Sequence, residues 1–303
     1  MIKTVLTVGT FDGVHLGHRA VLHEIARRAK AARLTSVLVT FEPHPLEVIN
    51  PAAAPPLLTL PEEKRAILAE MPVDRVEFVP FTEELRNFPP ERFVREVLEA
   101  RFHIAELVIG HDHGFGRGRS GDEDLLRRIG KEDGFSVDVI EAVEVDGRAV
   151  SSTMIRRAVA GGDLALAERA LGRPYGVTGV VVKGAGRGRT IGVPTINLAP
   201  PSPRKLLPPD GVYACAVRHA GGYNGAMANL GGRPTFGEAV RSLEAHLFGH
   251  SGDLYGERVT VEFVRRIRDV VRFETVEALQ AQLARDQEAA LAALRMWGRP
   301  VTL

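Results

Sequence analysis

The sequence has little cysteine, no excess of charge of one sign and no long apolar run. Its single cysteine, Cys215, has no partner for an intrachain disulfide and excludes a zinc site built from several cysteines. Lys and Arg total 39 and Asp and Glu total 38, so the formal net charge is +1. A nucleic-acid surface needs a basic excess or stripe, and a membrane span needs about 18 consecutive apolar residues. We therefore expect neither nucleic acid nor a membrane as a partner.

The beginning of the chain and its composition predict a soluble protein of the cytoplasm. The first eight residues lack a basic segment and run directly into a glycine turn, which is typical of a buried first strand and not of a signal peptide. A length of 303 residues, with 45% hydrophobic and 25% charged residues, suggests two ordinary globular domains. We expect small-molecule substrates and a monomer or weak homo-oligomer.

The first half of the chain alternates predicted strands with predicted helices. Apolar or β-branched runs, each a predicted strand, occupy residues 5–8, 35–41, 74–79, 106–109 and 136–140. Helical spacing occurs at residues 20–32, 62–69, 90–101 and 123–132. This alternation predicts a parallel sheet covered by helices on both faces. Ligands bind beyond the carboxyl ends of such strands, so the loops after Val8, Phe41 and Ile109 are expected to form a site.

The pattern changes after residue 171. Two predicted helices at residues 151–160 and 163–171 end at Gly172-Arg173-Pro174. Short strands follow at residues 175–182, 195–198, 211–218, 222–229, 243–248 and 258–265, and an amphipathic helix follows at 276–295. Such strands predict a small β-barrel. We place the domain boundary so that the domains are 1–171 and 172–303, and we expect the proline-rich residues 51–56 to form a surface loop.

The run GTFDGVHLGH at residues 9–18 follows a predicted buried strand and opens a helix. Glycines let the backbone approach phosphate, and a helix N-terminus presents free N–H groups to anions. His15 and His18 can each donate Nε2–H to a phosphate whose charge grows in the transition state. A plain pair of surface histidines is disfavoured by this context, and a metal site would lack a third ligand nearby. The motif predicts a site that cleaves ATP and transfers its adenylyl group.

Two further segments carry groups suited to phosphate. The run SSTMIRR at residues 151–157 opens a helix with hydroxyls and arginines that can hold β- and γ-phosphates, although Ser and Thr are also ordinary N-caps. The run GHDHGFGRGRSGD at residues 110–122 follows a strand and is either a phosphate-gripping loop or an exposed turn.

These three motifs resemble the adenylyltransferase half of the prokaryotic bifunctional riboflavin kinase/FAD synthetase family, and FEPHP at residues 41–45 is similar to the family's F-x-P-H-P loop. The resemblance implies a Rossmann-like nucleotidyltransferase sheet in which His15 and His18 are the catalytic contacts of ATP. It implies that Asp112 contacts the adenosine or flavin. The full binding set that it implies is Gly9, Phe11, Asp12, Gly17, Asp112, Ser152, Thr153 and Arg156. The sequence departs from the family pattern at His113, where Phe is usual, and at Val150, where Ile is usual.

The run GAGRGRTIGVPTINL at residues 184–198 combines a glycine–arginine loop with a Thr-x-Asn strand. On a strand, Thr195 and Asn197 point to the same side, and their oxygens suit Mg²⁺, although two outward polar residues are the plainer interpretation. The segment resembles the riboflavin kinase loop and its P-T-x-N motif, as do GVYA at 211–214, NLGGRPTF at 229–236 and DLYG at 253–256. The resemblance implies a kinase β-barrel with a C-terminal helix. The nucleotide contacts that it implies are Gly184, Arg187, Arg189, Thr195 and Asn197, with Thr195 and Asn197 as metal ligands.

The strand LEAHLF at residues 243–248 carries the remaining candidate. Glu244 alternates with apolar Leu243 and Leu247, and by itself such a residue would be a solvated carboxylate. The resemblance makes Glu244 the general base of the kinase. It implies an enzyme that phosphorylates riboflavin to FMN and adenylylates FMN to FAD, with ATP and Mg²⁺ in use and FAD and pyrophosphate as final products.

Two alternatives remain beside this interpretation. An H-x-G-H nucleotidyltransferase with another acceptor, such as a pantetheine or nicotinamide nucleotide, would not need the P-T-x-N barrel. A flavin-binding carrier or regulator without catalysis would not need the catalytic residues, which are present as His15, His18 and Glu244.

Overall fold

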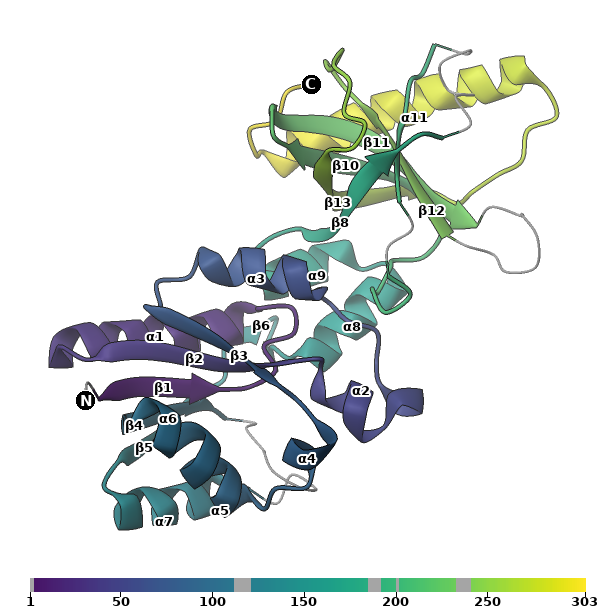
Figure 1. The fold of residues 1–303 in the computed structure, drawn as a ribbon. Helices are drawn as coiled ribbons and strands as arrows, with labels where there is room; N and C mark the ends of the chain where they lie inside the picture. Colours follow the sequence, from purple (N-terminus) through teal and green to yellow (C-terminus); the bar gives the residue numbers. More distant parts are fainter. Residues whose placement is uncertain (1–2, 112–120, 185–191, 200–201, 233–240) are drawn as a thin grey trace. The chain divides into compact units, whose positions relative to one another are not determined.

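The computed structural model describes residues 3–111, 121–184, 192–199, 202–232 and 241–303. The chain divides into two compact units, Met1–Ser152 and Thr153–Leu303, and the elements of each are labelled in Figure 1. The predicted functional boundary between residues 171 and 172 lies inside the second of these units.

The first unit is built on a five-stranded parallel sheet with the order β3-β2-β1-β4-β5. Its strands are β1 Thr4–Val8, β2 Thr35–Glu42, β3 Arg75–Pro80, β4 Ile104–Gly110 and β5 Ser136–Ile140. The chain order reverses direction between β1 and β4, and in open parallel sheets ligands bind at such a switch point. The predicted parallel sheet is confirmed, and the predicted strands agree with the observed ones to within about two residues at each end.

Helices cover both faces of this sheet, as Figure 1 shows. On one face α1 (Leu16–Ala32) and α3 (Pro61–Ala69) pack on Val5, Leu38 and Val108. On the other face, Leu6 and Leu107 lie in a second core with helical residues of segments 90–102 and 123–133. These segments are α5 Pro90–Arg92, the π-helical turns η2 Phe93–Glu99, α6 Ala100–Phe102 and α7 Glu123–Asp133. Neighbouring residues of one strand serve opposite cores because side chains alternate across a sheet.

The stretch after β2 contains short helices, and one of them begins within residues 51–56, where the sequence predicted a surface loop. His44 caps α2 (Pro45–Ile49) by accepting from the Leu46 amide at 3.2 Å, and Asn50 caps the 3₁₀ turn η1 (Pro51–Ala53). Proline is the first residue of both helices and has its φ already suited to a helix. The remaining short elements of this unit are α4 Glu83–Arg86, β6 Glu144–Val145 and β7 Arg148–Ala149.

The second unit is a closed antiparallel barrel with the strand order β10-β11-β12-β9-β8-β13. Its strands are β8 Tyr175–Val182, β9 Ile196–Leu198, β10 Gly211–His219, β11 Gly222–Gly232, β12 Arg241–Leu247 and β13 Arg258–Arg268. The helices of this part are α8 Ser152–Gly161, which begins at the boundary of the units, α9 Leu164–Leu171 and α11 Val276–Trp297. The predicted barrel with a C-terminal helix is therefore confirmed.

The barrel has an apolar interior and one helix-covered outer face. Tyr213 and Phe263 meet inside it with ring centroids 5.1 Å apart. Cys215 is fully buried, and burial raises the pKa of its thiol, which keeps the group in its unreactive form. Outside, Ala290 and Leu294 of α11 pack on Met227 and complete a separate cluster.

Candidate functional site

The loop between β1 and α1 holds two residues in left-handed backbone conformations. Phe11 has φ of 49° and Val14 has φ of 40°, and both side chains are buried. Such a conformation costs a non-glycine residue on the order of 1–3 kcal/mol and persists only where the surroundings fix it. The loop is therefore shaped by its contacts and not by local preference, as is common at ligand sites.

The two histidines of the loop lie ring against ring. His15 is the N-cap of α1, and its Nδ1 accepts the His18 amide at 3.3 Å. Since Nδ1 is an acceptor, the neutral ring carries its proton on Nε2. The His15 and His18 rings stack with centroids 3.6 Å apart, and the Phe11 ring lies 4.5 Å from that of His18. The structure thus brings together three of the predicted site residues.

Gly17 is needed because the His15 ring lies directly above it. A Cβ on Gly17 would be 3.2 Å from His15 Cε1 and 3.3 Å from its Nδ1, closer than ordinary van der Waals contact. A side chain at this position would push the ring away from the helix N-terminus that it caps. Gly17 therefore serves the site by leaving space for a histidine. Gly9, which is also in the predicted set, lies at the start of the loop, and its amide donates to the Val39 carbonyl at 3.0 Å.

Asp12 holds the loop to a segment 46 residues further along the chain. The carboxylate is 3% exposed. Its Oδ1 accepts from the Thr59 amide at 2.9 Å and the Thr59 hydroxyl at 3.0 Å, and its Oδ2 accepts from the Leu58 amide at 3.0 Å. The Ser152 hydroxyl donates to the Asp12 carbonyl at 2.9 Å. The Ser152 side chain thus contacts the backbone of Asp12. The Asp12 carboxylate fixes the loop to Leu58 and Thr59.

Lys64 was not predicted as a site residue, yet it lies directly beneath this loop. Its Nζ donates to the Phe41 carbonyl at 3.0 Å and to the Thr40 hydroxyl and the Thr10 carbonyl at 3.3 Å each. Burial lowers the pKa of this ammonium, while Asp12 and Glu42 act in the opposite direction. One signal was present in the sequence: Lys64 lies on the same helical stripe as Ile67, Leu68 and Met71, so its burial followed from the period.

Several predicted residues cannot be compared with the loop. Thr153 is exposed and Arg156 is half-buried in α8, which belongs to the second unit. Asp112 lies outside the described residues, as do His113 and the two loop arginines Arg187 and Arg189. Their roles stay predictions.

A row of polar residues crosses the barrel on its outer side. In the strand register, Glu244 of β12 stands opposite Asn197 of β9 on one side and opposite Asn229 of β11 on the other. Directly opposed residues of antiparallel strands have Cβ atoms about 4.5–5.5 Å apart and share a face. Leu243 and Ala245 are buried in the barrel, so Glu244 faces outward. The register brings the predicted base and one predicted metal ligand together.

Gly184 passes closely over the Asn197 amide. A Cβ on Gly184 would be 2.2 Å from Asn197 Nδ2 and 2.7 Å from its Oδ1, so the amide or the chain at Gly184 would have to shift. Asn197 is 8% exposed, whereas Thr195 is partly buried just before β9 begins. The chain before Thr195 is fixed at Pro194, whose carbonyl lies 2.7 Å from His246 Nδ1. Gly184, Asn197 and Glu244 therefore form one surface.

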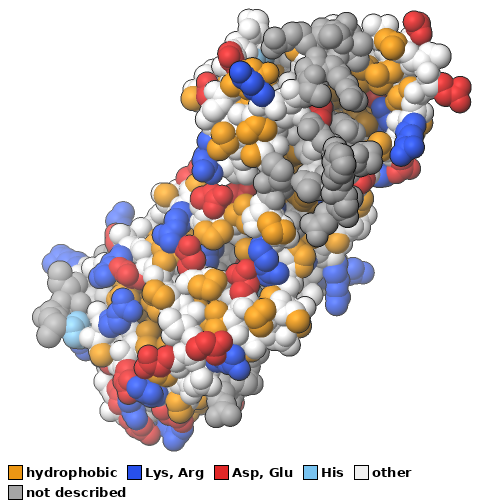
Figure 2. All heavy atoms as spheres, turned by 45° about the vertical axis from the view of Figure 1, so that its right-hand side comes forward, with side chains coloured by type: hydrophobic (Ala, Val, Ile, Leu, Met, Phe, Trp, Pro, Cys, Tyr) orange, Lys and Arg blue, Asp and Glu red, His pale blue; other side chains and the backbone are white. Residues whose placement is uncertain are grey.

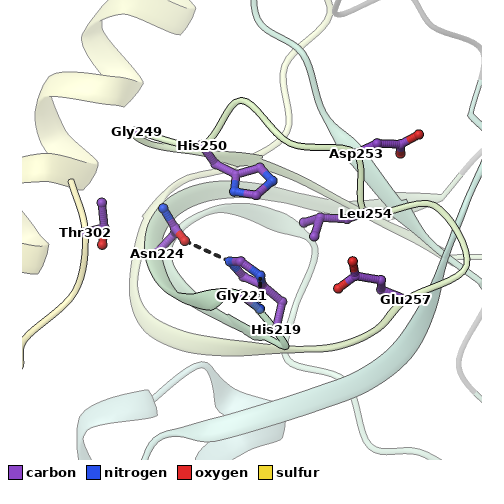
Figure 3. A pocket seen from close by; sticks show the side chains of 9 residues that line it. All are labelled: His219, Gly221, Asn224, Gly249, His250, Asp253, Leu254, Glu257 and Thr302. Atoms are coloured by element: carbon purple, nitrogen blue, oxygen red, sulfur yellow. Dashed lines mark hydrogen bonds between the residues drawn. The ribbon is translucent and has the colours of Figure 1, made fainter.

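A cavity of about 350 Å³ opens at one end of the barrel (Figure 3). The His219 and His250 rings approach each other there with centroids 5.0 Å apart, and His219 Nε2 lies 2.8 Å from Asn224 Oδ1. Asp253 and Glu257 also line it. Because Val180 of β8 pairs with Arg258 of β13, this is the end from which β8 continues toward Gly184. The cavity thus lies at the barrel end where β8 ends at Val182.

Two family models match the chain and together cover most of it. The model for FAD synthetase matches residues 1–154, and the model for riboflavin kinase matches residues 171–294. A bifunctional riboflavin kinase/FMN adenylyltransferase of Pseudomonas fluorescens is 40% identical over 289 residues, covering 95% of this chain and 92% of the relative. This chain belongs to the bifunctional riboflavin kinase/FMN adenylyltransferase family. The predicted family and enzyme class are confirmed.

Other comparisons agree with this family and fold. The Escherichia coli K12 bifunctional riboflavin kinase/FMN adenylyltransferase is 40% identical over 284 residues, covering 93% of this chain and 90% of the relative. A crystal structure named macrolide-efflux protein, from Streptococcus pneumoniae, superposes with a TM-score of 0.84 at 30% identity, covering 95% of this chain and 94% of the other. That name belongs to the other protein. In this riboflavin kinase/FMN adenylyltransferase, none of the helices among the described residues is long and apolar enough to cross a membrane.

The surface charge of this bifunctional enzyme is mixed. On the face shown in Figure 2, basic and acidic side chains of the described residues alternate instead of gathering by sign. This distribution agrees with the near-equal totals of 39 basic and 38 acidic residues in the whole chain. Local recognition of phosphate must therefore come from particular loops and side chains.

Proposed function

We propose that this chain adenylylates FMN at the β1–α1 loop and phosphorylates riboflavin on the outer face of the barrel at Glu244. The observation that carries the first assignment is the His15 cap, which places the proton of the neutral ring on Nε2, with the His18 ring stacked against it. The observation that carries the second is the cross-strand pair of Glu244 and Asn197.

In the adenylyl step, an FMN phosphate oxygen attacks the α-phosphorus of ATP. The new P–O bond forms as the bond to the bridging oxygen of the β-phosphate breaks, and pyrophosphate leaves. His15 and His18 donate to the α-phosphate oxygens as their charge grows, and the free amides at the start of α1 add to this field. Ser152, Thr153 and Arg156 hold the phosphate tail, and Asp112 contacts the adenosine or flavin. No covalent enzyme intermediate is needed, since positioning and charge stabilisation supply the rate.

In the kinase step, Glu244 takes the proton of the riboflavin 5′-hydroxyl, and that oxygen attacks the γ-phosphorus of ATP. The bond between the γ-phosphorus and the β–γ bridging oxygen breaks, and ADP leaves with FMN as the product. A base must lie within hydrogen-bond reach of the proton that it accepts, and the outward direction of Glu244 allows this. We assign Gly184, Arg187 and Arg189 as contacts of the nucleotide.

The donor set beside Glu244 fits Mg²⁺. Asn197 and Thr195 offer an amide and a hydroxyl oxygen, and the missing side chain at Gly184 leaves space for the Asn197 amide itself. In the part of the chain that the structure describes there is no group of three His, Cys, Asp or Glu suited to a metal. Mg²⁺ typically binds through one or two protein oxygens together with substrate phosphates and water. When bound, it supplies neutralisation of phosphate charge during transfer.

The remaining proposals concern the domain boundary, the cellular location and the partners of the protein. Residues 1–171 form the adenylyltransferase part and 172–303 the kinase part. The protein works in the cytoplasm on small molecules, as a monomer or weak homo-oligomer, with no nucleic acid as a partner.

A single incubation tests the proposed function. Purified protein is mixed with riboflavin, ATP and Mg²⁺, and the flavins are separated by chromatography. Conversion of riboflavin to FMN and then to FAD is expected. A flavin carrier would return only riboflavin, and an adenylyltransferase for another acceptor would leave supplied FMN unchanged. Either result would overturn the proposal.

A further inference from the structure

The ammonium of Lys64 is placed at the junction between the β1–α1 loop and the end of β2. Lys64 belongs to α3 and is 8% exposed. Its three acceptors come from two places: the Thr10 carbonyl lies in the loop, and the Thr40 hydroxyl and Phe41 carbonyl lie in β2. The Thr40 hydroxyl in turn donates to the Thr10 carbonyl at 3.1 Å.

All three protons of the ammonium have an acceptor. A neutral amine has two protons, so it would leave one of these oxygens without its donor. Burying a charge is costly unless it is hydrogen-bonded, and two carbonyls and a hydroxyl meet that condition for Nζ. The ammonium also makes a cation–π contact with Phe78, since Nζ lies 5.6 Å from the centroid of that ring.

The acceptor Thr10 is one residue away from the ring that packs on the histidine pair. Phe11 follows Thr10 with φ of 49°, and its ring lies 4.5 Å from that of His18. A shift of the Thr10 carbonyl would turn the next peptide and move this ring. Asp12 also fixes this loop, because its carboxylate accepts from the backbone amides of Leu58 and Thr59 just before α3.

We propose that Lys64 is a positioning residue for FMN adenylylation, which fixes Thr10 and thereby holds Phe11 against His18. This inference rests on the proposed function of the loop. Lys64 contacts protein oxygens in the structure, so its effect on the reaction passes through the loop and its histidines. A displacement of about 1 Å at a reacting group can cost about 100-fold in rate, which sets the scale of the expected effect.

The first experiment compares Lys64→Met with Arg65→Met. Methionine keeps the length of lysine but removes the ammonium, and Arg65 is the next cation of α3, half-exposed and paired with Glu42. We expect Lys64→Met to lower kcat for adenylylation of supplied FMN by roughly 10- to 100-fold, with a smaller change in KM for ATP. Arg65→Met is expected to stay within about twofold of wild type, because it leaves Thr10 in place. Equal kcat in the two variants would overturn the inference.

Hydrogen exchange separates positioning from general stability. In Lys64→Met, the amides of residues 9–18 should exchange faster while those of the β1 and β4 core keep their protection. If the whole first unit exchanged faster to the same degree, Lys64 would be a stability residue and the inference would be wrong. The riboflavin kinase activity of the same sample, expected unchanged, reports the amount of intact protein.

The pH dependence of adenylylation provides a further test, in which the wild-type enzyme is compared with Lys64→Arg. Burial places the pKa of Lys64 below its usual range, Asp12 and Glu42 oppose this shift, and Arg65 adds to it. As the pH rises, the kcat for adenylylation should therefore begin to fall at a lower pH than that at which an exposed lysine titrates. Lys64→Arg should shift this alkaline decline to higher pH. An alkaline decline of kcat at the same pH in both proteins would contradict the inference.

His18→Ala separates a failure of the proposed function from a failure of the inference about Lys64. If His18→Ala leaves FAD formation intact, the proposed function fails. If His18→Ala loses FAD formation while Lys64→Met keeps it, only the role of Lys64 is rejected.

Discussion

Asn197 and Glu244 stand directly opposite each other where β9 pairs with β12. Asn197 is buried and Glu244 half-buried, and they lie 47 residues apart in the sequence (244 − 197). The ladder gives each residue a fixed neighbour, so the amide that we propose as a metal ligand lies beside the carboxylate that we propose as the proton acceptor. These assignments can be tested by substitutions at Glu244, at Gly184 beside the Asn197 amide, and at the two histidines of the loop. A further substitution tests a buried ion pair of the barrel unit.

Replacing Glu244 by Gln should abolish most FMN formation without affecting FAD formation. Glutamine keeps the shape but cannot accept the hydroxyl proton, and loss of a general base typically costs 10²- to 10⁴-fold. The measurement is FMN production from riboflavin, followed by FAD production from supplied FMN. Asn229→Ala, on the other side of Glu244, is the matched control and should keep most of the kinase rate. A Glu244→Gln kinase near the wild-type rate would show that another base acts.

Replacing Gly184 by Ala should impair the kinase alone. The new Cβ would lie 2.2 Å from Asn197 Nδ2, so the amide or the loop must move. We expect a rise in KM for ATP and a fall in kcat, each of about tenfold or more. Gly161→Ala at the end of α8 has no atom within 4 Å of the new Cβ and serves as the control. Normal kinase kinetics in Gly184→Ala would show that Asn197 has no part in the site.

His15 and His18 should respond differently to replacement by Ala. Both variants are expected to lose adenylylation by about 10²- to 10³-fold, as for removal of a transition-state donor. Only His15→Ala also removes the cap of α1, which should lower the free energy of unfolding by about 1 kcal/mol. Denaturant unfolding and FAD synthesis are measured together, with exposed His23→Ala on the same helix as the control. Equal stability of the two variants would contradict the capping role.

Asp286 of α11 should matter for stability and not for either reaction. It is 1% exposed and accepts from Arg268 at 2.8 and 2.6 Å and from Gln282 at 2.8 Å. Removing one partner of such a buried pair typically costs about 3–5 kcal/mol. Asp286→Ala should therefore lower Tm clearly while both activities persist at low temperature. Glu288→Ala, exposed on the same helix, should leave Tm unchanged, and a similar Tm for both variants would refute the prediction.

The sequence was sufficient for the elements and the motifs because these depend on local patterns. Apolar runs and helical spacing predicted the parallel sheet and the barrel, and the glycines of residues 9–18 predicted a ligand loop. The order of strands and the register of Glu244 against Asn197 depend on contacts between distant segments, which a local pattern does not contain. The family resemblance, and not the spacing, named Glu244.

Long-range support of the site was the part that the sequence did not predict. The Asp12 carboxylate binds amides of Leu58 and Thr59, and Lys64 binds a carbonyl of the loop. Backbone groups have no sequence signature, so these partners were invisible. The helical stripe that includes Lys64 indicated burial but not what the ammonium contacts.

The closed barrel also limits how this chain can associate with other copies of itself. A barrel has no free strand edge, so the second unit cannot extend its sheet into a neighbouring molecule. The open sheet of the first unit has two edges, β3 and β5, and both carry charge. Arg75 pairs with Glu77 on β3, and Asp138 on β5 binds Arg28 at 2.6 Å. Fibre-like growth by strand addition is therefore opposed at the margins of these two sheets, by closure in the barrel and by ionic side chains in the five-stranded sheet.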